Sequence, residues 1–264
     1  MGHWTPSKIE RIVREHPLTS TKPVLVKTDE GLALLKYMGN SQGNFALFSE
    51  WVCANLAREV GIEIPNFAIL HCASMELTKA LVRTDPGPAF LSQWNEQAET
   101  FTSPTMCIDT LREPRGLELL LAFDTWIKNT DRFGVPGSPN LDNLLLVPDK
   151  RKSRWVAIDH THALVEFNEA ELSDPDWSND TNLYGALGEF IETMDQSAVV
   201  EALDRLNRID SRAIENIVNT APTEWGPVTA IRENLATQLC ERARLMNSWF
   251  ESQVFRQVKF DFGE

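Results

Sequence analysis

The sequence contains few cysteines and no long apolar stretch. Its four cysteines are far apart and form no CxxC pair: Cys53, Cys72, Cys107 and Cys240. This spacing predicts neither a disulfide framework nor a zinc site, and it favours buried free thiols. No segment approaches the roughly 20 consecutive apolar residues of a membrane-spanning helix, and residues 1–17 lack the apolar centre of a signal peptide. The sequence therefore predicts a cytoplasmic protein without a membrane span.

Positive charge is also scarce. The chain has 25 Lys and Arg residues against 38 Asp and Glu residues, which gives a formal net charge of -13 at pH 7. Such a chain repels phosphate backbones, so the composition argues against DNA or RNA as a partner. The length of 264 residues suits one large domain or two small lobes with a sizeable core.

The opening third of the sequence is β-rich and then helical in pattern. Two short apolar runs, residues 24–28 and 32–38, flank an Asp-Glu-Gly turn and predict an antiparallel hairpin. Residues 45–60 have apolar side chains at helical spacing, and Gly61 is a typical helix end. Residues 67–71 are predicted to form a further strand.

The rest of the sequence indicates a connection followed by a mainly helical part. Residues 83–105 contain several prolines among polar residues, which is typical of a connection between lobes. A buried helix is predicted over residues 116–129, and a second hairpin over residues 144–148 and 155–158. Beyond Trp177 the apolar pattern is helical.

This order predicts an α+β fold with two lobes. We expect a small β-rich N-lobe over residues 1–83 and a connection over residues 84–105. A mostly helical C-lobe with one embedded hairpin would follow over residues 106–264.

Three polar side chains are expected to meet at the open end of the second hairpin. Asp131 lies on a loop after the buried helix, where a carboxylate can orient a hydroxyl proton. Asn143 precedes one strand and Asp159 follows the other. Paired strands are about 5 Å apart, so both side chains can reach one Mg²⁺ ion. His160 and His162 also alternate here, but no third histidine is near enough in sequence to favour zinc.

These segments resemble a known family. The sequence NTDR at residues 129–132, NLLL at 143–146 and WVAIDH at 155–160 resemble the catalytic and metal-binding segments of HipA-like kinases, and more distantly those of phosphatidylinositol kinases. The resemblance implies a kinase-like fold with two lobes. It also implies that Asp131 is the catalytic base and that Asn143 and Asp159 hold Mg²⁺. We expect Arg132 to fix the loop around Asp131.

The N-terminal part shows a similar resemblance. The sequence STKPVLVKTDEGLALLKYMGNSQGN resembles the phosphate loop, hairpin and lysine strand of the same family. Lys36 would then contact the phosphates of ATP, and Glu50 would hold Lys36 in place. The loop lacks glycine, so the hydroxyls of Ser20 and Thr21 and backbone N–H groups would have to lie over the phosphates.

Some alternatives stay open at this point. Twelve positions separate Asp131 from Asn143, and residues 133–139 look like an inserted loop. Asn140 and Asp142 are therefore rival metal ligands, although Asn143 directly precedes the apolar strand. Glu59 is the alternative partner of the lysine.

The resemblance implies an ATP- and Mg²⁺-dependent kinase that transfers the γ-phosphate to a hydroxyl. A protein Ser or Thr is the first expected acceptor, because the family includes Ser/Thr kinases that act as toxins in toxin–antitoxin systems. A small molecule or a lipid head group is the first alternative. A nucleotide-binding pseudokinase with a regulatory role and a nucleotidyl transferase also remain open. Because the chain is so acidic, Mg²⁺ and local cations would have to offset the charge of the triphosphate.

Overall fold

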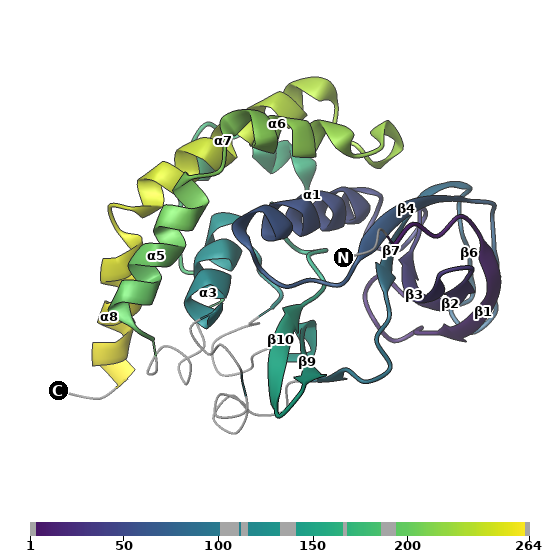
Figure 1. The fold of residues 1–264 in the computed structure, drawn as a ribbon. Coiled ribbons are helices and arrows are strands. Elements are labelled where there is room, and N and C mark those ends of the chain that lie inside the picture. Colours follow the sequence, from purple (N-terminus) through teal and green to yellow (C-terminus); the bar gives the residue numbers. More distant parts are fainter. Residues whose placement is uncertain are drawn as a thin grey trace.

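The structure is a computed structural model that describes residues 4–100, 111, 116–132, 141–165, 168–185 and 194–261. Figure 1 shows a β-rich N-terminal part beside a mostly helical C-terminal part, which confirms the predicted α+β class. The strands are β1 (Ile9–Glu15), β2 (Val24–Thr28), β3 (Gly31–Lys36), β4 (Phe67–Cys72), β5 (Glu76–Leu77), β6 (Val82–Arg83), β7 (Gly87–Gln93), β8 (Glu99–Thr100), β9 (Leu144–Asp149) and β10 (Lys152–Ala157). The α-helices are α1 (Phe45–Val60), α3 (Gly116–Trp126), α5 (Gln196–Asn207), α6 (Ser211–Thr220), α7 (Thr229–Met246) and α8 (Phe250–Asp261).

Five strands of the N-terminal part form an antiparallel sheet in the order β1-β2-β3-β7-β4. The predicted first hairpin is β2–β3. Its turn brings Thr28 opposite Gly31, whose φ of 112° suits a residue without a side chain. Lys36 is the last residue of β3 and lies at the opposite end of the hairpin from this turn.

The sequence does not predict two strands of this sheet. β7 lies within residues 84–105, the expected connection, yet it is the strand between β3 and β4. Residues 89–91 of β7 are buried, but prolines and a glycine at its start give a turn-like pattern. β1 is an exposed edge strand and therefore lacks a continuous apolar face. The lobe boundaries at residues 1–83 and 106–264 remain predictions.

One apolar core joins the two parts of the chain. α1 has the predicted range and ends at Gly61, whose φ of 86° allows the left-handed cap. Side chains of α1 pack in one cluster with Phe67 and Phe90 of the sheet and with side chains of α3, α5, α6 and α7. The indole of Trp225 also donates a 2.9 Å hydrogen bond to the carbonyl of Pro88 in β7. α1 thus holds Glu50 in a fixed position between the sheet and the helices.

The predicted second hairpin is β9–β10. Leu144 pairs with Ala157 at its open end, and β8 adds a third strand. Asn143 directly precedes β9, and Asp159 lies two residues after the end of β10. Among the residues that the structure describes, no helix is both long and apolar enough to cross a membrane.

Candidate active site

The ammonium group of Lys36 lies at the centre of a buried cluster. It donates to the carboxylate of Glu50, and it lies 2.8 Å from Asp159 Oδ1 and 2.8 Å from Thr161 Oγ1. Thr161 Oγ1 in turn lies 2.9 Å from Glu50 Oε1, and its backbone N–H donates to Asp159 Oδ1 at 3.2 Å. An ammonium group has three N–H donors, and these three acceptors use all of them.

Three elements bring these side chains together. β3 supplies Lys36, α1 supplies Glu50, and the loop after β10 supplies Asp159 and Thr161. Asp159 has a φ of 59°, a left-handed conformation that is uncommon for residues other than glycine. The hydrogen bond from the N–H of Thr161 to the Asp159 carboxylate closes this turn.

Burial and charge act in opposite directions on the ionisable groups of the cluster. Burial alone would lower the pKa of Lys36, but the charges of Asp159 and Glu50 outweigh it and raise the pKa above its ordinary value. Burial alone would raise the pKa of Asp159, but Lys36 holds it well below its ordinary value. Burial raises the pKa of Glu50 despite its contact with Lys36. Lys36 is therefore cationic and Asp159 anionic at neutral pH.

Asp131 and Asn143 face each other at the open end of the β9–β10 hairpin. The amide nitrogen of Asn143 donates to Asp131 Oδ2 at 3.0 Å. The carbonyl of Asn143 accepts a 3.1 Å hydrogen bond from the N–H of Ile158, the residue before Asp159. The structure thus brings Asp131, Asn143 and Asp159 together at one end of the hairpin, although they are distant in sequence.

The guanidinium of Arg132 is fully buried and connects the segments around the site. It donates to the Asp124 carboxylate (2.9 Å), the carbonyls of Asn143 (2.7 Å) and Ile158 (2.8 Å), and the ring of His160 (2.9 Å). A guanidinium only donates, so His160 Nε2 is the acceptor. Burial, and then the charge of Arg132, holds the pKa of His160 well below its ordinary value, so the ring is neutral. Arg132 therefore holds these neighbouring segments in place through its hydrogen bonds.

Two oxygen-bearing side chains of the hairpin fit a Mg²⁺ ion. Asn143 uses its amide nitrogen on Asp131, which leaves its amide oxygen for a cation. Asp159 has a second carboxylate oxygen besides the one that contacts Lys36. Mg²⁺ commonly takes one or two protein carboxylates and completes its octahedron with phosphate oxygens and water. This donor set therefore fits a metal that arrives with a phosphate ligand.

The alternative candidates for the metal ligand and for the lysine partner differ in exposure from the favoured residues. Asp142 is exposed, whereas Asn143 is buried, and Glu59 is exposed on α1, whereas Glu50 contacts Lys36. Asn140 and the expected insertion lie outside the described residues.

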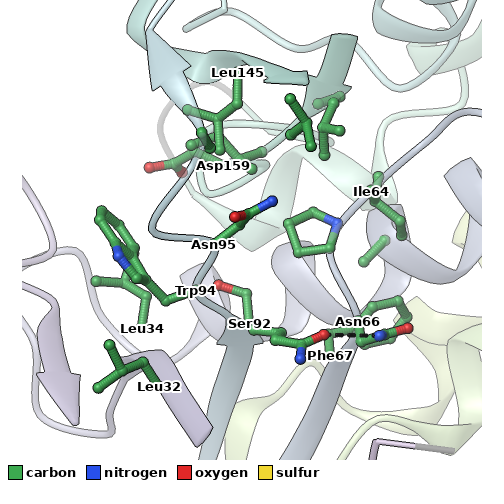
Figure 2. Close-up of a pocket in the computed structure, with 18 of the residues that line it drawn as sticks. Leu32, Leu34, Ile64, Asn66, Phe67, Ser92, Trp94, Asn95, Leu145 and Asp159 are labelled. Atoms are coloured by element: carbon green, nitrogen blue, oxygen red, sulfur yellow. Dashed lines mark hydrogen bonds between the residues drawn. The ribbon is translucent and has the colours of Figure 1, made fainter. Parts of the chain in front are cut away.

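A cavity of about 770 Å³ opens beside the Lys36 cluster. Its charged end is lined by Lys36 and Asp159, and apolar side chains such as Leu34 and Leu145 line its walls. Figure 2 shows Leu145 and Asp159 on the opposite side of the cavity from Leu34 and Trp94. Pockets of roughly 300–1,000 Å³ commonly bind small organic ligands. The cavity therefore has the volume and the polarity for a ligand with one apolar part and one anionic part.

The turn between β1 and β2 holds the remaining predicted residues. Ser20 is exposed and Thr21 is buried. The Ser20 carbonyl accepts a 2.5 Å hydrogen bond from the hydroxyl of Ser41. Neither Ser20 nor Thr21 is among the described residues that line the cavity. Their contact with phosphate stays a prediction.

Two residues of this region were not expected from the sequence. Thr161 bonds to three members of the cluster, and Trp94 lines the cavity from the segment after β7. The nearest sequence signal for Thr161 was its position two residues after Asp159. For Trp94, no motif gave a signal.

The family and the fold follow from comparisons with known proteins. A family model described as HipA-like kinase matches residues 9–258. The proinflammatory kinase CtkA of Helicobacter pylori is 14% identical, with a TM-score of 0.60 over 92% of this chain and 96% of CtkA. The toxin–antitoxin complex of HipA, HipB and operator DNA from Shewanella oneidensis MR-1 contains a chain that is 10% identical, with a TM-score of 0.50 over 97% of this chain and 67% of that one. A comparison with proteins of curated function found no match. The two structural likenesses show a kinase fold with two lobes, and the family match over nearly the whole sequence means that this chain belongs to the HipA-like kinase family.

Proposed function

We propose that the chain is an ATP- and Mg²⁺-dependent kinase that phosphorylates the hydroxyl of a protein Ser or Thr. The observation that carries this proposal is the buried contact of Lys36 with Glu50 and Asp159 at the charged end of the cavity. Phosphoryl transfer depends mainly on positioning and on charge stabilisation, which such a cluster can supply. Membership of the HipA-like kinase family supports the same reaction class.

The nucleotide would lie along the cavity. Its base fits between apolar walls such as Leu34 and Leu145, and its phosphates point toward Lys36. The cationic amine of Lys36 attracts the phosphates, which offsets the repulsion from an acidic chain. Asn143 and Asp159 would hold Mg²⁺, which neutralises the charge of the phosphates when it is bound.

Asp131 would act on the acceptor. Its carboxylate orients the acceptor hydroxyl and accepts the proton of that hydroxyl as the new O–P bond forms, while the bond between the γ-phosphorus and the β–γ bridging oxygen breaks and ADP leaves. The amide of Asn143, which is 3.0 Å away, fixes the direction of this carboxylate. Arg132, the next residue, would hold the loop by its hydrogen bonds to the carbonyls of Asn143 and Ile158 at the open end of the hairpin.

The proposed acceptor follows from membership of the HipA-like kinase family, which includes kinases of protein Ser or Thr, and we place the reaction in the cytoplasm. The HipA relative from Shewanella oneidensis MR-1 belongs to a toxin–antitoxin system. Incubation of the protein with γ-labelled ATP, Mg²⁺ and a cell lysate tests this proposal. Label in a protein band as phosphoserine or phosphothreonine supports it, and label only in small molecules contradicts the acceptor class.

A set of variants tests the site itself. Asp159→Ala should abolish Mg²⁺-dependent transfer while the far-ultraviolet circular dichroism stays unchanged. Glu50→Gln should impair transfer strongly. Glu59→Gln is the matched control, because this exposed carboxylate lies on the same helix and should leave the rate unchanged. Wild-type turnover in Asp159→Ala would remove Asp159 from the proposed site.

A further inference from the structure

The hydroxyl of Thr161 occupies a central place between two charged groups. It accepts a hydrogen bond from Lys36 Nζ at 2.8 Å and lies 2.9 Å from Glu50 Oε1. A hydroxyl has one donor and two acceptor sites, so it can accept from the ammonium and donate to the carboxylate at the same time. Thr161 is only 6% exposed, so water cannot easily replace this link.

The same residue also fixes the proposed metal ligand. The backbone N–H of Thr161 donates to Asp159 Oδ1 at 3.2 Å and supports the left-handed turn at Asp159. Thr161 therefore contacts the ammonium group of Lys36, the carboxylate of Glu50 and the carboxylate of Asp159. A change in the position of this loop would be transmitted to Lys36 through the Thr161 hydroxyl.

The donor count of Lys36 shows why this link matters for function. All three N–H donors of Lys36 already have acceptors in Glu50, Asp159 and Thr161. A phosphate oxygen can bond to Lys36 only when one of these acceptors leaves. Asp159 is the acceptor that also suits Mg²⁺. If its carboxylate bonds to Mg²⁺ in place of Lys36, one N–H of Lys36 becomes free, while Glu50 and Thr161 still hold the ammonium group. Of these two remaining acceptors, Thr161 is the uncharged one.

We propose that Thr161 is a positioning residue that holds Lys36 and Glu50 in register with Asp159, so that one N–H of Lys36 points toward the phosphates. This inference deepens the proposed kinase function and rests on it. The role requires a hydroxyl at this position, because only a group that both accepts and donates can bridge an ammonium and a carboxylate. A purely space-filling role would be met equally well by valine.

A pair of substitutions separates these two roles. Thr161→Val keeps the shape and removes the hydroxyl, and Thr161→Ser keeps the hydroxyl and removes a methyl group. We expect Thr161→Val to lower kcat by about 10- to 100-fold, as the loss of a charge-assisted hydrogen bond implies. The KM for ATP should change by less than about threefold, because the apolar walls of the cavity are untouched. Thr161→Ser should keep kcat within about threefold of the wild type.

Ser49→Ala is the matched control. The Ser49 hydroxyl links the same helix to the same loop through a 3.1 Å hydrogen bond to the carbonyl of Ala163, a bond that involves none of the charged groups of the cluster. This variant should lower the unfolding midpoint and leave kcat unchanged. A kcat of Thr161→Val within threefold of the wild type would overturn the inference, and so would an equal loss in Ser49→Ala.

A measurement that does not depend on phosphate transfer separates the role of Thr161 from the proposed kinase function. Acetylation of Lys36 by an amine-reactive acetyl ester, followed by mass spectrometry of its peptide, reports how firmly the amine is held. The labelling rate should rise in Thr161→Val and stay low in Thr161→Ser and Ser49→Ala. This pattern would support the role of Thr161 even if the wild type transferred no phosphate, an outcome that would refute only the proposed kinase function. Equal labelling in all four proteins would refute the role of Thr161.

Discussion

Replacing Arg132 by methionine should destabilise the fold severely. The Arg132 side chain has no exposed surface, and neither has that of Asp124, its partner at 2.9 Å. Methionine would leave the Asp124 carboxylate buried without its counter-charge, which typically costs about 3–5 kcal/mol. Whole proteins are stable by only about 5–15 kcal/mol, so Arg132→Met should lose a large fraction of the free energy of unfolding. Urea unfolding followed by tryptophan fluorescence measures this loss.

Three further variants make the measurement decisive. Asp124→Asn is measured alone and combined with Arg132→Met, which removes both charges, and the double-mutant cycle should give a coupling of about 2–3 kcal/mol. Arg205→Met is the control, because Arg205 forms an exposed ion pair with Glu201 at 2.7 Å, and such pairs contribute about 0.3–0.5 kcal/mol. A loss below about 1 kcal/mol for Arg132→Met, similar to that of a surface pair, would refute the reasoning.

Two more predictions concern pH and the cavity. Lys36 holds the pKa of Asp159 below its ordinary value of about 3.9, so the ionised carboxylate adds stability above that value and loses it as the pH falls. The urea midpoint of the wild type should therefore exceed that of Asp159→Asn less at about pH 4 than at about pH 6, and a constant difference would contradict this. Ser92→Trp should fill the cavity from β7 and weaken ATP binding at least about tenfold by calorimetry, whereas Ser173→Trp on the surface should bind normally. Unchanged affinity in Ser92→Trp would exclude the cavity as the nucleotide site.

The sequence predicts best what depends on local pattern. The helix over residues 45–60 and the two hairpins have a clear apolar spacing and clear turn residues, and the structure has them at nearly the predicted bounds. The proximity of Asn143 and Asp159 follows from hairpin geometry alone. The separation of Asp131 from Asn143 by twelve positions did not prevent their contact, because Arg132, the residue after Asp131, bonds to the carbonyls of Asn143 and Ile158 at the open end of the hairpin.

Features that depend on tertiary contacts were not predictable in the same way. β7 becomes a strand because β3 and β4 flank it on both sides, which overrides the turn-like residues at its start. The position of Thr161 depends on the left-handed backbone at Asp159, a conformation that aspartate adopts only occasionally and that the sequence alone therefore does not indicate. Lys36 and Glu50 were paired only by family resemblance, since their spacing in sequence carries no periodic signal.

The shared core around α1 affects how the two parts of the chain can move. Phe67 and Phe90 of the sheet are packed into the same apolar cluster as the C-terminal helices, and Trp225 bonds to the backbone at Pro88. Wide separation of the parts would expose this apolar surface to water. A single proteolytic cut within residues 94–98 should therefore leave two fragments that remain associated under native conditions. The packing of the shared core, and not the peptide connection at residues 94–98, would then hold the sheet and the helical part together.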